Sequence, residues 1–126
     1  AAARRGKLPV AEQWYRKSAK AGVAPSVITF NALINAAARQ GNLSAAEGWA
    51  KKMEESRIQP DSVTLGEIVN AAAKQGDLKA AERWYQRAGS LGIQADAITY
   101  TALIDAAARL GDIEAAIRWY DEAVSA

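Results

Sequence analysis

The chain of 126 residues contains no cysteine and no histidine. Without cysteine there is no disulfide and no thiol nucleophile, and without either residue type the usual zinc ligands are missing. The lack of histidine also removes the commonest general base and the catalytic triads built on it. No apolar run approaches the ~20 residues that cross a bilayer as a helix. We therefore expect a protein that is not an enzyme, uses no metal or other cofactor, and does not span a membrane.

Neither sign of charge dominates the sequence. The 16 lysine and arginine residues and the 14 acidic residues give a formal net charge of +2. This charge permits an acidic partner such as a nucleic acid but does not require one. The acidic residues Glu54, Glu55, Asp61 and Glu67 have no neighbouring groups in the sequence that would complete a catalytic site. We interpret them as solvated surface charge.

What the sequence does contain is an internal repeat. The motif NAAARQG at 35–41 returns as NAAAKQG at 70–76 and as DAAARLG at 105–111, and AAARRG at 1–6 resembles a shortened copy. Four glycines and four tryptophans each recur every 35 residues: Gly6, Gly41, Gly76 and Gly111, and Trp14, Trp49, Trp84 and Trp119. A fixed period over the whole chain predicts an array of one supersecondary unit. The predicted divisions are a partial repeat at 1–26, repeats at 27–61 and 62–96, and a repeat at 97–126 truncated at its C-terminal end.

Each repeat is predicted to form two helices. Apolar residues at i, i+3, i+4, i+7 and i+8 indicate the first helix. In the first complete repeat these are Phe30, Leu33, Ile34, Ala37 and Ala38, and the pattern recurs in the next two repeats. Gly41 predicts the end of that helix. Asn42, like Asp77 and Asp112 later, predicts the N-cap of a second helix, which runs from about Leu43 to Ser56 in this repeat.

One helical hairpin cannot bury its apolar face alone, so stacked hairpins are expected to form an all-α solenoid. The second helix turns one face toward this core. Its residues are Leu43, Ala46, Trp49, Ala50 and Met53. Because the tryptophans lie beside this apolar face, we interpret them as packing residues rather than as platforms on which bases stack.

A second line of residues, spaced by 3, 4 and 4 positions, follows one side of each first helix. Its members are Ile28, Asn31, Asn35 and Arg39, then Val63, Gly66, Asn70 and Lys74, then Ile98, Thr101, Asp105 and Arg109. Each line starts with a branched aliphatic residue and ends with a cation. Stacking would align the cations in a row, which suits single-stranded RNA because cations hold phosphates and polar groups read base edges. The alternative is a solvated face whose cations favour the end of a helix dipole.

The period of 35 and the segment VITFNALINAAARQGNLSAAEGWAKKMEESRIQPD resemble the pentatricopeptide repeat family, and the resemblance covers the whole chain. The tetratricopeptide family is a poorer match, because its repeat is one residue shorter and its tryptophan lies in the first helix. The resemblance implies an α-solenoid of paired helices. It also implies a protein of mitochondria or plastids that binds single-stranded RNA at about one base per repeat.

The resemblance further implies which residues read the bases. A polar residue early in the first helix acts with the last residue of the same repeat, which gives Asn31 with Asp61 and Gly66 with Asp96. The Asn–Asp combination resembles the family's uracil pair. Thr101 favours a purine, and its partner lies beyond the sequence given. Ser26 closes the partial repeat, whose reading residue is missing.

The remaining contacts expected from the resemblance are to base faces and to phosphates. The aliphatic residues that sandwich bases are Ile28, Val63 and Ile98, and the cations that contact phosphates are Arg4, Arg39, Lys74 and Arg109. Two residues depart from the pattern, because Gly66 has no side chain with which to read a base and Asp105 adds a negative charge. These departures, and apolar faces expected at both ends of the array, favour a second hypothesis. In it the chain is a scaffold or accessory subunit that binds proteins in an organellar ribosome, photosystem or respiratory assembly.

Overall fold

The computed structural model describes residues 13, 15–17, 20–22 and 26–126. From residue 26 onward the chain forms six α-helices of 13 residues each. They are α3 (Val27–Arg39), α4 (Leu43–Glu55), α5 (Ser62–Lys74), α6 (Leu78–Ser90), α7 (Ala97–Arg109) and α8 (Ile113–Ser125). The described residues contain no strand, and the predicted all-α class is confirmed. No helix in this part of the chain is long and apolar enough to cross a membrane.

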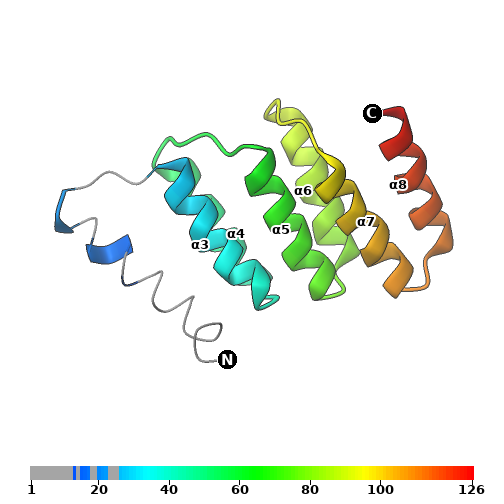
Figure 1. Ribbon diagram of the computed structural model, residues 1–126, viewed down its shortest axis with the longest axis horizontal. Helices are drawn as coiled ribbons and strands as arrows, with labels where there is room; N and C mark the ends of the chain where they lie inside the picture. The colour runs from blue at the N-terminus through cyan, green and yellow to red at the C-terminus, as the bar shows by residue number, and fades with distance from the viewer. Residues whose placement is uncertain (1–12, 14, 18–19, 23–25) are drawn as a thin grey trace.

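The helices form two layers (Figure 1). The first layer consists of α3, α5 and α7, which lie side by side because α5 packs against both of the others. The second layer consists of α4, α6 and α8, each packed against the first-layer helix that precedes it in the chain. This order of alternating layers is that of stacked helical hairpins, and it places the predicted line of polar residues on the first layer.

The helix ends form at the predicted residues. The side chains of Asn42, Asp77 and Asp112 accept the backbone N–H three residues further on, at 3.1, 3.0 and 3.1 Å. Each thereby satisfies one of the N–H groups that a helix leaves unpaired at its start. Just before these caps, Gly41, Gly76 and Gly111 adopt φ angles of 66°, 71° and 73°. This left-handed conformation ends the preceding helix and is one that glycine adopts without a steric penalty.

In the turns that follow the second helix of a repeat, one residue with a positive φ angle is not glycine. Gly22, Arg57 and Gly92 occupy equivalent positions with φ angles of 78°, 61° and 76°. Arg57 is therefore a residue with a side chain held in the left-handed region, where its Cβ crowds the backbone. The turn is kept because the N–H of Ile58 donates to the carbonyl of Met53 at 3.0 Å, as the N–H of Ile93 does to Ala88 at 2.8 Å.

The core lies between the two layers and contains the predicted positions. Phe30, Leu33 and Ile34 are buried in α3, and their equivalents are buried in α5. In α7 the prediction is wrong for Ala108, which is exposed, although Ala38 and Ala73 are buried at the same position. The reason is packing, because α5 covers α3 and α7 covers α5, whereas none of the described helices packs on the other side of α7.

The tryptophans of the second layer join neighbouring repeats. Trp119 is buried, and Trp49 and Trp84 pack half-buried against the core. The indole Nε1 of Trp84 donates to Glu47 of the preceding repeat at 2.7 Å, and that of Trp119 donates to Glu82 at 2.8 Å. Their interpretation as packing residues is confirmed, and Trp14 lies outside the described residues.

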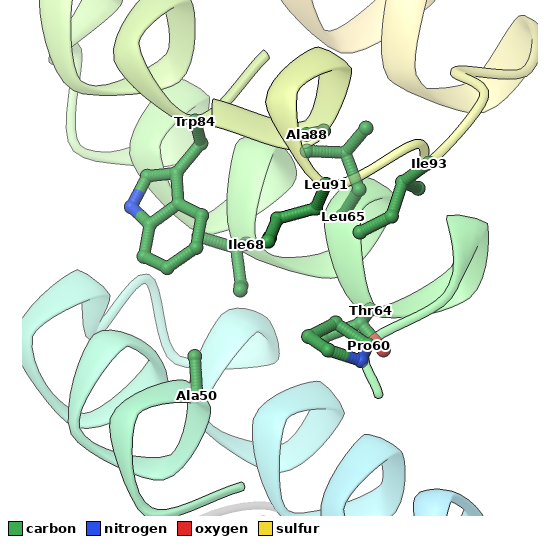
Figure 2. A pocket seen from close by; sticks show the side chains of 9 residues that line it. All are labelled: Ala50, Pro60, Thr64, Leu65, Ile68, Trp84, Ala88, Leu91 and Ile93. Carbon is green, nitrogen blue, oxygen red and sulfur yellow. The ribbon is translucent and has the colours of Figure 1, made fainter. Parts of the chain in front are cut away.

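A small apolar void remains in the core between α4, α5 and α6 (Figure 2). Its nine lining residues include Ala50, Ile68 and Trp84, and it has a volume of about 10 Å³. A cavity of this size holds at most one water molecule, and an apolar lining offers that water no partners. This void is a feature of core packing, so the candidate site must lie on the surface.

Candidate nucleic-acid interface

The line of residues predicted along the first helices lies on one face of the first layer. At its N-terminal edge Ile28, Val63 and Ile98 are 77%, 52% and 67% exposed. Single exposed apolar residues are ordinary on protein surfaces. Here the same position is aliphatic and exposed in three successive repeats, which gives a regular series of exposed apolar side chains, one in each repeat. The other members of the line follow on the same side of each helix.

Asn31 and Asp61, the pair predicted to read a base, meet where α3 and α5 come together. The amide Nδ2 of Asn31 donates to Asp61 Oδ1 at 3.1 Å. The hydroxyl of Thr64 donates to Asn31 Oδ1 at 2.5 Å and also lies 3.0 Å from Asp61 Oδ1. Asp61 is in addition the N-cap of α5, because its carboxylate accepts the backbone N–H of Thr64 at 3.0 Å. The helix cap therefore holds the orientation of the Asn31 amide.

The carboxyl group of Asp61 is ionised at neutral pH. Partial burial alone raises its pKa, but the hydrogen bonds that it accepts from Thr64 and Asn31 outweigh burial and lower the pKa below its ordinary value. An ionised carboxylate only accepts hydrogen bonds, so the Asn31 amide must donate to it. One amide hydrogen and one carbonyl lone pair of Asn31 then remain for a ligand.

The second repeat has the same aspartate–threonine cap but lacks the side chain that is predicted to read a base. Asp96 caps α7 by accepting the backbone N–H of Thr99 at 3.2 Å, and the Thr99 hydroxyl lies 3.4 Å from the same carboxylate. A Cβ atom at Gly66 would lie 3.4 Å from the Thr99 hydroxyl and 3.6 Å from a methyl carbon of Ile98. Both are close to ordinary contact distances. Asp96 therefore has no side chain at Gly66 to orient, although a small one would fit.

The two remaining predicted readers are accessible. Thr101 is exposed on α7. Ser26 is exposed and caps α3 by accepting the backbone N–H of Thr29 at 3.4 Å. Among the described residues, neither of them is brought together with a second residue predicted to read a base.

The cations at the end of the line are exposed but differ in their partners. Arg39 donates through Nε to Asn35 Oδ1 at 2.9 Å. Arg109 forms an ion pair with Asp105 at 3.0 Å, so the negative charge noted in the sequence is offset within its own repeat. Within the described part of the chain no ion pair engages Lys74. Arg4, predicted as the cation of the partial repeat, lies outside the described residues.

The interpretation of four acidic residues as solvated charge is only partly right. Glu55 is exposed. Glu54 forms an ion pair with Arg87 of the next repeat at 2.5 Å. For Asp61 and Glu67 the interpretation is wrong, because Asp61 belongs to the network described above and Glu67 is half-buried on the first layer. Among the described residues no cluster of acidic side chains is arranged to hold a metal ion.

Glu67 lines an open groove along α5. The groove has a volume of about 350 Å³, and its other lining residues are Asn35, Ser62, Val63, Gly66, Asn70, Asp96 and Ile98. Burial raises the pKa of Glu67 to about 7. Sequence reasoning did not assign Glu67 to the site, because Glu67 lies one position outside the predicted line. The available signal was its contrast with alanine at the equivalent positions, Ala32 and Ala102.

Thr64 is the other residue of the site that sequence reasoning missed. It recurs every 35 residues with Thr29 and Thr99. That recurrence was visible in the sequence, but its role was not, because Thr64 contacts Asn31 across 33 residues of chain. All three threonines follow the N-cap of a first helix by three positions.

Comparison with known families agrees with this geometry. A family model described as a pentatricopeptide repeat domain matches residues 13–75, and one described as a PPR repeat matches residues 98–126. The chain belongs to the pentatricopeptide repeat family. The resemblance stated from the sequence is thereby confirmed, and the two-layer arrangement is the PPR helical-repeat solenoid. No curated protein sequence matches closely enough to be counted as a relative.

Solved structures of PPR proteins share the fold. PPR10 in complex with an 18-nt psaJ RNA element matches 94% of this chain with a TM-score of 0.84 and 24% identity. PPR10 from maize matches 96% with a TM-score of 0.71 and 30% identity. The PPR domain of Arabidopsis thaliana protein-only RNase P 1, in complex with tRNA, matches 98% with a TM-score of 0.81 and 20% identity. This PPR chain spans 17% of the PPR10 chain and 66% of the RNase P domain chain.

Proposed function

We propose that the first layer of this PPR array binds single-stranded RNA at about one base per repeat. The proposal is carried by one observation, which is that successive repeats present the same order of groups on one face. Each has an exposed aliphatic residue, then the position of the reading residue, then a cation. Cations provide affinity for phosphates, and the polar pair provides base selection.

The first complete repeat has the complete set of groups. Ile28 and Val63 are both exposed and flank the Asn31–Asp61 pair in the sequence, and we expect them to contact the two faces of one base. Asn31 presents a donor beside an acceptor, held by Asp61 and by Thr64. Uracil presents the complementary arrangement on its Watson–Crick edge, an N–H beside a carbonyl. We therefore expect this repeat to prefer uracil.

The second and third repeats contribute less selection. Gly66 lacks a reading side chain, and Thr101 has no partner in the sequence given, although its family role points to a purine. Each stacked base contributes ~1–3 kcal/mol, and association costs several kcal/mol. Three bases at most are therefore bound weakly by this chain, and the binding experiment belongs at low salt.

The test is equilibrium binding of the chain to short single-stranded RNAs with and without a central uracil, at several salt concentrations. The slope of log K against log salt should be about −0.7 for each phosphate contacted. Asn31→Ala should abolish the uracil preference, whereas Gln86→Ala, which removes an exposed amide of the second layer, should leave it intact. No binding of any RNA at low salt would overturn the proposal.

A protein partner is the second candidate, and α8 favours it. This helix and the turn before it expose large apolar residues: Leu110, Ile113, Ile117, Tyr120 and Val124. Under this hypothesis the chain is a scaffold or accessory subunit of an organellar ribosome, photosystem or respiratory assembly. Ile117→Asp should then release the protein from its assembly in sedimentation of an organelle extract, while Arg39→Glu with Lys74→Glu should not. Since PPR proteins are generally organellar, we expect a mitochondrial or plastid location under either proposal.

A further inference from the structure

The outer faces of α7 and α8 are exposed, although the corresponding faces of the preceding helices are covered. In the first layer α5 packs on α3 and α7 packs on α5, and Ala38 and Ala73 are buried, whereas the equivalent Ala108 is exposed. In the second layer Leu78 is 7% exposed, whereas Ile113 at the same position of α8 is 62% exposed. Positions that belong to the core in one repeat are therefore open to a partner in α7 and α8.

The exposed face of α8 carries a continuous apolar stripe. Its members are Ile113, Ile117, Tyr120 and Val124, each more than half exposed. They are spaced by 4, 3 and 4 positions, which places them along one side of the helix. This is the spacing of the seam by which one helix packs against another. We call these four residues the α8 stripe.

The α8 stripe is more apolar than the same face of the preceding second-layer helices. Ile117 stands at the position of Glu47 and Glu82, the two glutamates that accept a tryptophan Nε1 from the following repeat. Val124 stands where α6 has Gly89. The face of α8 therefore suits a partner that buries apolar side chains, and it lacks the glutamate with which the preceding repeats bind their neighbours.

Acidic side chains border the α8 stripe on one side. Glu114 and Asp121 are both exposed and lie seven residues apart along that side. The corresponding residues of α6 are Lys79 and Gln86. Within the described part of the chain no ion pair engages Glu114 or Asp121. This border favours a partner with cations and opposes the packing of two α8 stripes on each other, because their acidic borders would then meet.

The chain itself supplies a surface of the opposite charge. Residues 1–25 contain six lysine and arginine residues against one acidic residue, a net charge of +5, whereas residues 26–126 contain ten against thirteen, a net charge of −3. Among these cations Arg16, Lys17 and Lys20 are helical and exposed. The neighbouring Tyr15 packs on Phe30 at the start of the array, and Figure 1 shows residues 15–17 at the opposite end from α8. The two ends of the molecule are therefore complementary in charge.

We propose that the α8 stripe binds the basic N-terminal end of a second copy of this protein, head to tail. The apolar stripe is covered, and Glu114 and Asp121 meet the cations at Arg16 and Lys20. The proposal rests on the second candidate function, because it uses the same face of α8 and identifies the partner. It does not depend on RNA binding, which uses the first layer. Because the two contacting surfaces differ, every added copy leaves one α8 stripe and one basic end free for a further copy.

Sedimentation velocity of the purified chain over a range of concentrations tests this assignment. The average sedimentation coefficient should rise with concentration and pass the value of a dimer, because a head-to-tail contact leaves a free site at each end. Added salt should weaken the association, since salt screens exposed charges. Circular dichroism of each variant verifies that it is folded.

A charge in the α8 stripe should prevent the contact. Ile117→Asp should weaken self-association by on the order of tenfold or more, because an apolar residue at the centre of the contact is replaced by a carboxylate. Ile98→Asp is the matched control, since it places the same charge on an exposed isoleucine of the first layer. The control should associate as the wild type does. Equal losses in both variants would overturn the assignment to α8.

Charge reversal at the two ends identifies which surfaces meet. Glu114→Lys with Asp121→Lys opposes cations to cations, and Arg16→Glu with Lys20→Glu opposes carboxylates to carboxylates. Each double variant alone should therefore associate several-fold more weakly than the wild type. An equimolar mixture of the two should recover the association, because the reversed end of one variant then meets the reversed end of the other.

Three results would overturn the head-to-tail contact. They are a wild type that stays monomeric at every concentration, a mixture that associates no better than its components, and unchanged association of Arg16→Glu with Lys20→Glu. The last result would show that α8 packs on α8 instead. A monomeric wild type that still sediments with an assembly of an organelle extract would keep the second candidate function and show that its partner is another protein.

Discussion

The first and second complete repeats share a backbone and differ in the groups that they offer a ligand. Each ends with an aspartate that caps the first helix of the following repeat and accepts from the threonine three residues further on. In the first repeat that cap also holds Asn31, whereas in the second the same place is empty at Gly66. The aspartate and the threonine belong to the helix cap, and so they are kept where the side chain predicted to read a base is absent.

The same comparison extends to two further positions. Glu67 of the second repeat stands where the first has Ala32, and Arg57 of the first stands where the second has Gly92. The first change places a titratable group in the groove, and the second places a side chain where the backbone is left-handed. Neither changes the length or order of the helices. The repeats therefore tolerate local departures because packing between layers determines the fold.

The largest expected effect comes from the feature that both repeats share. Reversing both cations with Arg39→Glu and Lys74→Glu should weaken RNA binding by on the order of 100-fold at low salt, because two phosphate contacts become repulsive. The slope of log K against log salt should shrink by about 1.4. Binding titrations at three or more salt concentrations measure both quantities.

The matched control reverses two exposed cations of the second layer. Lys51→Glu with Lys79→Glu makes the same change in net charge, on α4 and α6. If the first layer is the RNA surface, this control should retain most of the affinity. Equal losses in the two double variants would show that net charge, and no particular face, attracts the RNA.

The raised pKa of Glu67 leads us to expect a pH-dependent difference in stability between the wild type and Glu67→Gln. Its pKa is about 7 in the folded chain against an ordinary value of 4.5, so the folded state holds the proton more tightly. The stability that Glu67 contributes is therefore complete below about pH 4.5 and is lost as the pH rises through about 7. Glu67→Gln should raise the free energy of unfolding at about pH 8 by about 1–2 kcal/mol, after allowing for solvent screening of a half-buried group.

Urea denaturation at two pH values measures this difference. Near pH 4 the wild type and Glu67→Gln should unfold at similar urea concentrations, because both side chains are then neutral. The variant should be the more stable one only at the higher pH. A gain of the same size at both pH values would attribute the effect to packing rather than to charge.

The sequence predicted the repeat, the helix caps and most of the core, because these depend on local signals that recur with a fixed period. Asn42 and Gly41 act within one turn of the chain, and apolar spacing identifies the face that packs. The environment of Glu67 depends instead on α3, which lies a full repeat away. Burial created by a distant helix has no local signature, so a carboxyl interpreted as solvated was found half-buried with a raised pKa.

The difference between Asn31 and Gly66, the positions predicted to read a base, can be removed by placing an asparagine at position 66. Gly66→Asn should introduce a side chain opposite Asp96, since its Cβ meets its neighbours at 3.4 Å and 3.6 Å. The second repeat should then gain a uracil preference of roughly two- to tenfold, the range of one net hydrogen bond. Competition between RNAs that differ only at the second base position measures it. Gly66→Ala, which adds the Cβ without the amide, should show no such preference.

The smallest effect concerns the turn that differs between the repeats. Arg57 has a φ of 61°, in the region where Gly22 and Gly92 serve the other turns. A residue with a side chain is strained there by roughly 1 kcal/mol, while glycine is also more flexible when unfolded. Arg57→Gly should therefore raise the free energy of unfolding by about 0.5 kcal/mol, and Gly92→Ala should lower it by about 1 kcal/mol or more. Thermal denaturation of both variants distinguishes strain at Arg57 from a stabilising contact of its side chain, since in the second case Arg57→Gly would lower the stability as well.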